Sequence, residues 1–232
     1  ASPFYRPSPP TTSTSCRTYL RLDMLSVAAP TRISARAPAA RGLRAQRPLP
    51  TVTRRTVRAS PRCEVAVGDQ APDFTLMGPG FKPYSLSDYK GEKVVVTFFP
   101  AAFSGDANDG CQCHLTQFKS IAESGVNVIG ITKDSPFVMG PWQEFLGASF
   151  PTLSDFTLEV ASQYCGTFDL GQFLDNLSVS TGFTGYTASN RAVVVLDEDH
   201  KVIYTWVGKD GKGESSPGLL PPVDEVRSAL GM

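Results

Sequence analysis

The sequence has few of the residues on which disulfide-rich and metal-binding proteins depend. Its 232 residues include five cysteines and two histidines, His114 and His200. So few cysteines do not predict a disulfide framework, and two histidines do not predict a structural zinc site. The chain also has no glycine-rich phosphate loop and no Cys-x-x-Cys redox motif. Its thiols are therefore expected to serve either packing or chemistry, and neither a metal nor a cofactor is expected.

Acidic residues are almost absent from residues 1–63. This segment holds twelve arginines, no lysine and a single acid, Asp23, whereas residues 64–232 carry ten basic and 21 acidic residues. The formal net charge of zero therefore hides a basic leader joined to an acidic segment with a net charge of −11. Residues 64–232 are numerous enough to form one domain with a well-buried core.

The basic leader, residues 1–63, lacks an apolar run long enough for a signal peptide or a membrane span. From Met24 onward it is rich in Arg, Ser, Thr, Ala and Pro, which is typical of a disordered organelle transit peptide. A basic arm that binds nucleic acid or a membrane is the alternative. "VRAS" at 57–60 resembles a chloroplast processing site, with cleavage near Ala59; mitochondrial import is the runner-up. Residues 1–23 are interpreted as sequence upstream of a native start at Met24.

The hydrophobic pattern of residues 64–232 predicts an α/β domain. Apolar, β-branched runs predict strands at 74–77, 93–99, 126–132, 150–155, 191–197 and 201–207. Helical spacing and capping residues predict helices near 111–124, 136–147, 156–165 and 221–230. Pro141 is expected to limit where the second helix starts. Strands and helices alternate before a final hairpin and helix, which predicts a central mixed sheet flanked by helices, the thioredoxin-like arrangement.

Residues 167–190 lack this periodicity. They are polar and rich in Gly, Ser and Thr, so the sequence predicts a long connection with little regular structure. Connections of this length are often functional.

Four separated segments resemble a known family. They read "VGDQAPDFTL", "SLSDYKGEKVVVTFFPAAFSG", "VIGITKDSP" and "NRAVVVLDEDHKVIYTWVG". Over almost all of 65–230 the chain resembles the peroxiredoxins, and especially their single-cysteine bacterial alkyl-hydroperoxidase (thiol-specific antioxidant) branch. The resemblance implies a thioredoxin-like fold and a thiol-dependent peroxidase of cell redox homeostasis. Such an enzyme reduces hydrogen peroxide or alkyl hydroperoxides through a cysteine thiolate.

The active-site motif of that family is Pro-x-x-x-Thr/Ser-x-x-Cys. Pro100 and Ser104 match its first two fixed positions, but the nucleophile's position holds Ala107. One interpretation is that the loop is four residues longer and the helix one turn shorter, so that Cys111 takes the nucleophile's place. Another is a degenerate, non-catalytic thioredoxin-fold scaffold or binding protein. A third is a thiol–disulfide exchanger that works through Cys111 and Cys113.

Helix geometry favours Cys111 as the nucleophile. Positions 107 and 111 would point to the same side of a helix, one turn apart. Residues 108–110, Asn-Asp-Gly, are weak inside a helix and suit a loop and cap, with Asp109 at the N-cap. Cys111 would then lie in the first turn, where free amides and the helix dipole stabilise a thiolate. The nearby charges of Asp106 and Asp109 would oppose ionisation unless a cation offsets them.

Arg191 is the candidate cation. Only Arg191 and Arg227 follow residue 63, and Arg227, in the terminal helix, is expected to be solvated. Arg191 opens an apolar strand, where a charge is costly without a partner. It matches the arginine that peroxiredoxins place beside the thiolate. The alternative is a strand-end arginine paired with a surface carboxylate.

The resemblance implies a mechanism and partners for these residues. Cys111 would attack the peroxide, Ser104 would hydrogen-bond it, Arg191 would polarise it and Pro100 would shield the sulfur from water. The resulting sulfenic acid needs a second thiol. Cys113 would give a strained disulfide, and Cys165 is a further possibility, although a buried core thiol is its more ordinary role.

Partners outside the chain are also implied. Thioredoxin, glutaredoxin or glutathione would be the external route of reduction, and a homodimer is expected by analogy with the family. Neither nucleic acid nor a membrane is expected as a partner. A metal at "CQCH" with Asp109 is not expected, because no distant ligands are obvious.

Overall fold

The computed structural model describes residues 64–179 and 182–232. The predicted leader, with its processing site and Met24, lies outside the described residues. Within the described part of the chain, no helix has both the length and the apolar content needed to cross a bilayer.

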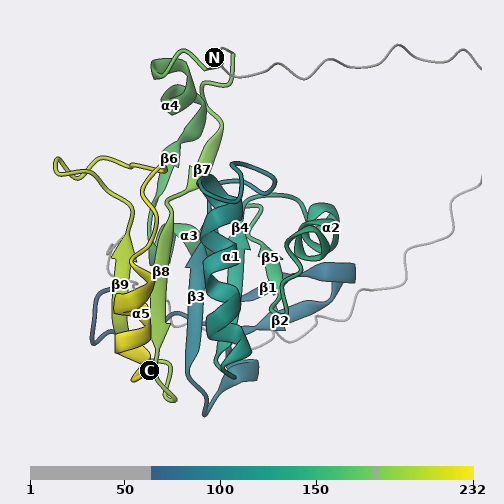
Figure 1. The fold of residues 1–232 in the computed structure, drawn as a ribbon, viewed down its shortest axis with the longest axis vertical. Coiled ribbons are helices and arrows are strands. Elements are labelled where there is room, and N and C mark those ends of the chain that lie inside the picture. Colours follow the sequence, from purple (N-terminus) through teal and green to yellow (C-terminus); the bar gives the residue numbers. More distant parts are fainter. Residues whose placement is uncertain (1–63, 180–181) are drawn as a thin grey trace, which may run out of the picture. The chain divides into compact units, whose positions relative to one another are not determined.

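Seven strands form one mixed sheet in the order β2-β1-β5-β4-β3-β8-β9 (Figure 1). Their bounds are β1 Thr75–Met77, β2 Pro83–Ser85, β3 Val94–Phe98, β4 Asn127–Thr132, β5 Thr152–Ser154, β8 Ala192–Leu196 and β9 Val202–Val207. β3, β4 and β5 run parallel, and β8 joins β3 antiparallel before turning into β9. The predicted mixed sheet with its final hairpin is confirmed.

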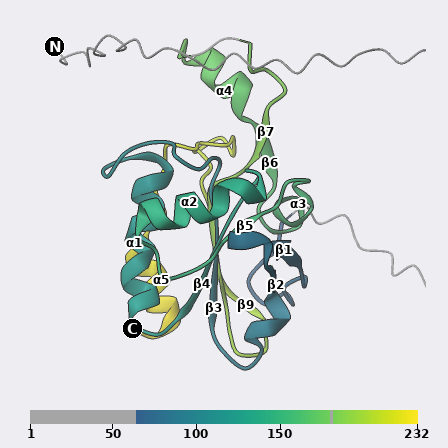
Figure 2. The same ribbon diagram turned by 90° about the vertical axis from the view of Figure 1, so that its right-hand side faces the viewer.

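Helices cover both faces of this sheet (Figures 1 and 2). The α-helices are α1 Gly110–Glu123, α2 Pro136–Leu146, α3 Glu159–Tyr164, α4 Leu170–Asn176 and α5 Val223–Leu230, and short 3-10 turns lie at η1 Pro79–Phe81 and η2 Leu86–Tyr89. Side chains of α1, α2 and α5 share one apolar cluster with Val95 and Phe99 of the β3 segment. Side chains of α3 and η2 share the other cluster with Val94, Val96 and Phe98. Because side chains alternate along a strand, the two clusters lie on opposite faces of the sheet.

Central β3 explains why the sheet forms as the sequence predicts. All five of its residues are buried, so the unbroken apolar run 93–99 fits a strand covered on both faces. Thr97 is its only polar member, and its hydroxyl is hydrogen-bonded. The strand ends at Pro100, and this end carries the segment that leads to α1.

Two expectations about the helices differ from the structure. Helix α2 starts at Pro136 and runs through Pro141, so Pro141 does not limit the start; its missing N–H leaves one helical hydrogen bond unmade. Helix α3 is shorter than the predicted 156–165, because Leu158 adopts a left-handed backbone with φ 60° just before it. The cap of α1 is confirmed: Asp109 is the N-cap.

The expectation of little regular structure in 167–190 was wrong. β6 Thr167–Asp169 and β7 Thr187–Ser189 pair antiparallel and carry α4 between them, forming an arm that projects beyond the sheet (Figures 1 and 2). The carboxylate of Asp169 accepts hydrogen bonds from the backbone amides of Gln172 and Gly185, at 2.9 and 2.7 Å. These elements are three to seven residues long, too short to produce a visible hydrophobic period.

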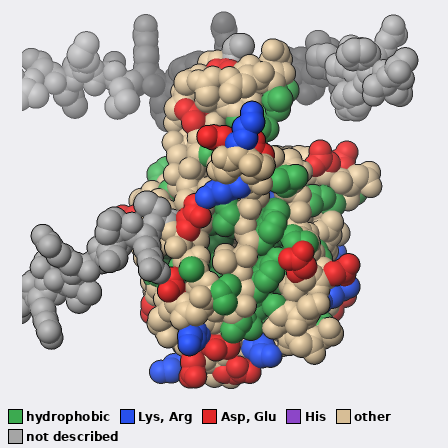
Figure 3. All heavy atoms as spheres, turned by 90° about the vertical axis from the view of Figure 1, so that its left-hand side faces the viewer, with side chains coloured by type: hydrophobic (Ala, Val, Ile, Leu, Met, Phe, Trp, Pro, Cys, Tyr) green, Lys and Arg blue, Asp and Glu red, His purple; other side chains and the backbone are tan. Residues whose placement is uncertain are grey.

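The β9 edge of the sheet faces the viewer in Figure 3, where hydrophobic side chains gather over the middle of the surface. Most residues of β9 are half-buried, and Tyr204 donates a hydrogen bond to Glu225 of α5 at 3.0 Å. Helix α5 therefore packs alongside the last strand and closes this side of the domain.

Candidate active site

The segment between Ser104 and Cys111 forms a small loop that closes on itself. Gly105 and Gly110 pair as an isolated antiparallel bridge, and the amide of Asp106 donates to the carbonyl of Asp109 at 2.9 Å. Both glycines have positive φ, 78° and 72°, a region that favours glycine. A Cβ on Gly105 would lie 2.3 Å from the carbonyl oxygen of Asp109 and 2.5 Å from the Cα of Gly110. Glycine is therefore required where the two ends of the loop meet.

This loop brings Ser104 next to Cys111 despite their separation in the sequence. The carbonyl of Ser104 accepts hydrogen bonds from the amides of Cys111 and Gln112, at 3.1 and 3.2 Å. Residues 106–109 are looped out, and Ala107 is exposed on that loop rather than in the helix. The shortest path across the bridge is thus Ser104-Gly105-Gly110-Cys111, which restores the Ser-x-x-Cys spacing.

Cys111 lies in the first turn of α1 and is 1% exposed. Its Sγ accepts a hydrogen bond from Nη2 of Arg191 at 3.5 Å. Arg191 comes from the chain just before β8, and the pairing of Phe98 with Ala192 places it beside the end of β3. The antiparallel register of β3 and β8 therefore brings the cation to the thiol across 80 residues of sequence.

Arg191 is 2% exposed and is held through its other nitrogens by neutral acceptors. Nε donates to the carbonyl of Pro217 at 2.9 Å, and Nη1 donates to the carbonyl of Gly110 and to Nδ1 of His114, both at 3.1 Å. Within residues 64–179 and 182–232 it forms no ion pair with a carboxylate. Its positive charge is therefore left for the sulfur and for a ligand beside it.

His114 positions Arg191 as a neutral base. Because arginine can only donate, Nδ1 of His114 is the acceptor in its hydrogen bond with Arg191. Nε2 of His114 therefore carries the ring proton and donates a hydrogen bond to Oγ1 of Thr97 at 2.7 Å. The Thr97 hydroxyl then donates to the carbonyl of Ala192 at 3.2 Å. Burial lowers the pKa of His114 well below its ordinary value, and the guanidinium of Arg191 lowers it further. The imidazole thus stays uncharged and does not repel the arginine.

A pocket of about 610 Å³ opens beside the sulfur. Its lining includes Pro100, Ser104, Cys111 and Arg191, the four residues to which the family resemblance gives a role in the reaction. Pro100 is buried, and the Ser104 hydroxyl donates to the carbonyl of Ala101 at 2.8 Å, which leaves its oxygen lone pairs as acceptors. The structure therefore gathers these predicted site residues around one cavity.

Cys113 and Cys165 lie in different surroundings from Cys111. All three are free thiols. Cys113 is 6% exposed on α1 and accepts a hydrogen bond from Nε2 of Gln117 at 3.4 Å. Cys165 belongs to the apolar cluster on the sheet face opposite Cys111, so the folded domain does not bring these two together.

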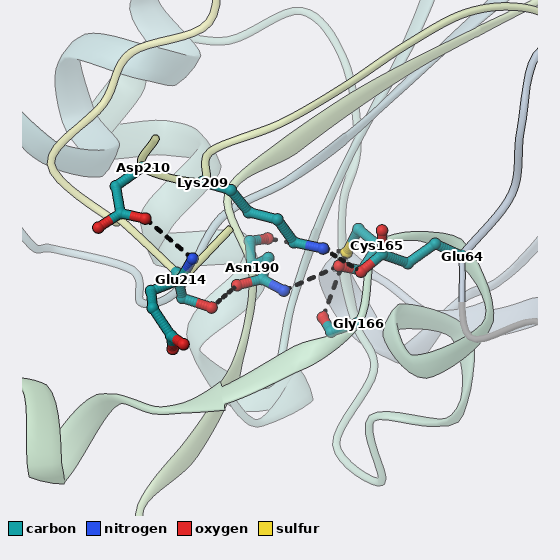
Figure 4. A network of polar contacts seen from close by, with 8 residues as sticks. Glu64, Cys165, Gly166, Asn190, Lys209, Asp210 and Glu214 are labelled. Carbon is teal, nitrogen blue, oxygen red and sulfur yellow. Dashed lines mark hydrogen bonds and ion pairs between the residues drawn. The ribbon is translucent and has the colours of Figure 1, made fainter. Parts of the chain in front are cut away.

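Figure 4 shows Cys165 at the edge of a polar network. Its carbonyl accepts a hydrogen bond from the side-chain Nδ2 of Asn190 at 2.8 Å, and Lys209 pairs with Glu64 nearby. Burial raises the pKa of the Cys165 thiol well above its ordinary value, and the carboxylates of Glu64 and Asp155 raise it further, against Lys209 and a backbone hydrogen bond. The surroundings of Cys165 therefore favour the neutral thiol over the thiolate.

The sequence did not reveal three residues that shape the site: Thr97, His114 and Pro217. Only the spacing Cys-x-x-His offered a signal for His114, because two residues that are three positions apart lie on the same face of a helix. Pro217 contributes its backbone carbonyl, and because every residue has one, the residue type at this position gives no signal. No cluster of three or more His, Cys, Asp or Glu side chains in the described residues could hold a metal.

Comparisons with known proteins relate the chain to one family. The model of the AhpC/TSA family matches residues 67–205. A thiol peroxidase of Bacillus subtilis is 31% identical over 174 residues, covering 72% of this chain and 90% of that protein. The peroxiredoxin Bcp of Bacillus subtilis is 27% identical over 146 residues, covering 61% and 85%.

A solved structure shows the same fold. The crystal structure of peroxidoxin BcpB from Mycobacterium tuberculosis superposes with a TM-score of 0.50 at 24% identity, covering 71% of this chain and 94% of that one. The family match spans more than half of the chain and includes the strand, loop and arginine that build the pocket. The chain therefore belongs to the AhpC/TSA family of peroxiredoxins.

Proposed function

We propose that this thiol-dependent peroxidase uses Cys111 as its nucleophile. The observation that carries the assignment is the bridge between Gly105 and Gly110, which loops out residues 106–109 and restores the Ser-x-x-Cys spacing. Cys111 then has the cation and the pocket that a peroxidatic thiol needs. The alternative of a degenerate binding protein is not favoured, because Ala107 lies on the looped-out segment 106–109 and the pocket beside Cys111 keeps Pro100, Ser104 and Arg191.

Each pocket residue has a role in the proposed reaction. The Cys111 thiolate attacks one peroxide oxygen; an S–O bond forms, the O–O bond breaks, and the leaving alkoxide or hydroxide takes a proton. Arg191 stabilises both the thiolate and the charge that develops on the leaving oxygen, because a donor in a buried site acts strongly on that charge. Ser104 accepts the peroxide's hydrogen bond, and Pro100 keeps water from the sulfur. The sulfur ends as a sulfenic acid.

The sulfenic acid is then reduced by a thiol, and we favour an external one of the thioredoxin, glutaredoxin or glutathione type. Cys165 lies on the other face of the sheet and is held neutral. Cys113 is two residues away on the same helix, so a disulfide with Cys111 would require the first turn of α1 to unwind. Recycling by glutathione alone in a Cys113→Ser protein would support the external route, whereas complete loss of turnover would assign Cys113 as the resolving thiol.

The test of the nucleophile is chemical trapping. The reduced chain would be mixed with one equivalent of hydrogen peroxide in the presence of a sulfenic-acid reagent, and the labelled peptide mapped by mass spectrometry. Rapid labelling at Cys111, absent from Cys111→Ser, is the expected result. If every thiol reacted no faster than free cysteine, the site would be inactive and the binding-protein alternative would return.

We also propose that residues 1–63 direct import into the chloroplast. Their arginine-rich, acid-poor composition supports this, and mitochondrial import is the alternative. The mass of the mature N-terminus in isolated plastids would test both the compartment and cleavage near Ala59.

A homodimer is a further proposal, supported by the exposed aromatic side chains of Phe103 and Phe145, at 51% and 56% exposure. Phe145 stacks on the ring of buried Trp142, with centroids 5.6 Å apart, while 56% of Phe145 remains exposed. Sedimentation of the wild-type chain and of Phe145→Ser would test this proposal.

A further inference from the structure

Asn190 is a buried polar residue that directly precedes Arg191 in the sequence. It is 3% exposed, and an amide buried to this extent is costly unless it is hydrogen-bonded. Its Nδ2 donates to the carbonyl of Cys165 at 2.8 Å (Figure 4), and its Oδ1 accepts from the hydroxyl of Ser215. Its backbone amide donates to the carbonyl of Gly166 at 3.1 Å. Asn190 therefore joins the end of α3, the start of β8 and a later segment of the chain.

The later segment, which carries Ser215, also holds Arg191. Residues 208–222, all of which the structure describes, contain no helix or strand. Within this segment the carbonyl of Pro217 accepts a hydrogen bond from Nε of Arg191 at 2.9 Å. None of residues 209–216 is buried, so apolar packing does little to fix this stretch of chain. The direction of the Pro217 carbonyl therefore depends on the hydrogen bonds that tie the segment to the domain.

Backbone hydrogen bonds shape this segment into a narrow turn. The amide of Gly208 donates to the carbonyl of Arg191, and the amide of Ser216 donates to the carbonyl of Gly208, both at 2.8 Å. Lys209 and Ser215 face each other as an isolated antiparallel bridge. The two ends of the turn therefore meet beside the backbone of Arg191, and the returning end leads directly to the carbonyl that holds the guanidinium.

The side-chain contacts that join the two halves of the turn to the domain differ in burial. Lys209, in the first half, pairs with Glu64, and the two side chains are 32% and 37% exposed. A pair so open to water contributes little to stability. Ser215, in the second half, donates to a buried acceptor on Asn190, and a hydrogen bond is stronger where water is excluded. This buried contact lies two residues before Pro217, so we expect it to hold the carbonyl in place.

We propose that Asn190 is a positioning residue of the peroxidase site and acts on Arg191 through the turn. The inference rests on the proposed function, in which Cys111 is the nucleophile. Asn190 anchors Ser215, this anchor fixes the Pro217 carbonyl, and the carbonyl directs the guanidinium. Without the anchor the turn can shift, and Nη2 of Arg191 loses its place 3.5 Å from the sulfur. A displacement of about 1 Å at a reaction centre is enough to slow the chemistry.

The test is a double-mutant cycle between Ser215 and Arg191 in the full chain. The second-order rate constant for oxidation of Cys111 by hydrogen peroxide would be measured by rapid mixing, acid quench and mass spectrometry. The forms compared are wild type, Ser215→Ala, Arg191→Gln and the double variant. Ser215→Thr keeps the hydroxyl and tests for rescue. Glu64→Gln is the matched control, because it weakens the ion pair on the same turn and leaves the buried contact in place.

The expected result is a loss of rate that depends on the arginine. Ser215→Ala should slow oxidation about fivefold, the effect that one hydrogen bond of ordinary strength has on an equilibrium. In the Arg191→Gln background the same change should alter the rate by less than about twofold, because the group on which the contact acts is gone. Ser215→Thr and Glu64→Gln should react as the wild type does. Asn190→Ala should slow oxidation at least as much as Ser215→Ala, and unchanged melting temperatures would exclude loss of the fold as the cause.

Three results would overturn the inference. An unchanged rate in Ser215→Ala would show that the contact does not position the cation. A full fivefold loss in the Arg191→Gln background would show that Ser215 acts on the fold and not through the arginine. A Ser215→Thr protein as slow as Ser215→Ala would show that the hydroxyl is not the group that matters. If hydrogen peroxide left Cys111 of the wild type unmodified, the proposed function itself would fail, before any variant was compared.

Discussion

Cys111 and Cys165 are two buried thiols on opposite faces of one sheet, and the charged groups around them differ. Cys111 is 1% exposed and accepts a hydrogen bond from a guanidinium, whereas Cys165 is 0% exposed and has two carboxylates among its neighbours. Cys111 also borders a cavity, and Cys165 packs among apolar side chains. Burial alone therefore does not separate a reactive thiol from a structural one; the neighbouring charge and the access to a pocket do.

The difference between the two thiols is tested most directly by removing each of them in turn. Cys111→Ser should lower the rate constant for hydrogen peroxide by at least about a thousandfold, because a hydroxyl cannot replace the nucleophile. Cys165→Ser should keep most of the activity. Stopped-flow consumption of peroxide would measure both, and an active Cys111→Ser protein would refute the assignment.

The cation is the next largest difference between the two surroundings. Arg191→Gln should slow oxidation of Cys111 by about 10²–10³-fold, the usual loss when one donor to a developing charge is removed. The matched control is Arg227→Gln, which changes the other arginine of the described domain, a half-exposed side chain bonded to Ser120. Equal rates in the two variants would show that the charge beside Cys111 has no catalytic role.

The close contact at the glycine bridge can be tested by comparison with a glycine that also has positive φ but has open space where a Cβ would lie. Gly105→Ala should reduce the free energy of unfolding by about 1–3 kcal/mol more than Gly213→Ala, because overpacking adds to the cost of positive φ. Gly213 has φ 82° with nothing within 4 Å of its Cβ position, against 2.3 Å at Gly105. Urea denaturation measures the difference, and Gly105→Ala should also slow oxidation of Cys111. Equal stabilities would mean that the loop closes without this contact.

The lowered pKa of His114 predicts how the free energy of unfolding changes in acid. Its pKa is lowered in the folded state, so below its unfolded value of about 6.5 the unfolded chain binds a proton that the folded chain does not. This contribution is present in full above that pH and is lost as the pH falls, by up to about 1.4 kcal/mol per pH unit. His114→Gln, which preserves an acceptor for Arg191, should make the acid slope shallower. An unchanged slope in urea titrations from pH 7 to 5 would contradict the assignment of a neutral histidine.

The smallest expected effect concerns Cys165. Its raised pKa means that the folded state holds a proton which the unfolded state releases above the ordinary cysteine pKa of about 8.5. This contribution is therefore complete below that pH and is lost as the pH rises. Cys165→Ala should flatten the alkaline slope slightly. At pH 8, iodoacetamide should modify Cys165 only after denaturation, and modification of the folded chain would contradict its neutral, closed surroundings.

Local sequence patterns were enough to predict all strands of the main sheet except β2, together with the four residues of the candidate site. The unbroken apolar run of β3, the hairpin of β8 and β9, and the N-cap at Asp109 are local signals, because strand and cap preferences depend on a few adjacent residues. Pro100 and Ser104 were identified by motif, Cys111 by helix geometry and Arg191 by the family resemblance, and the structure places all four around one pocket. Their catalytic roles stay predictions until the thiol is trapped.

The surroundings of Cys111, in contrast, could be established only from the folded chain. The closure of the 106–109 loop depends on a contact between Gly105 and Gly110, and the position of Arg191 depends on strand register and on His114 and Pro217. The position of α4 was decided in the same way. In the sequence it lay in a segment without visible period, and the β6–β7 arm carries its apolar residues to the pocket of Cys111. Long-range contacts of this kind are hard to predict from neighbouring residues. A hydrogen bond to a backbone carbonyl, or a close approach of two chain segments, is not specific to one residue type.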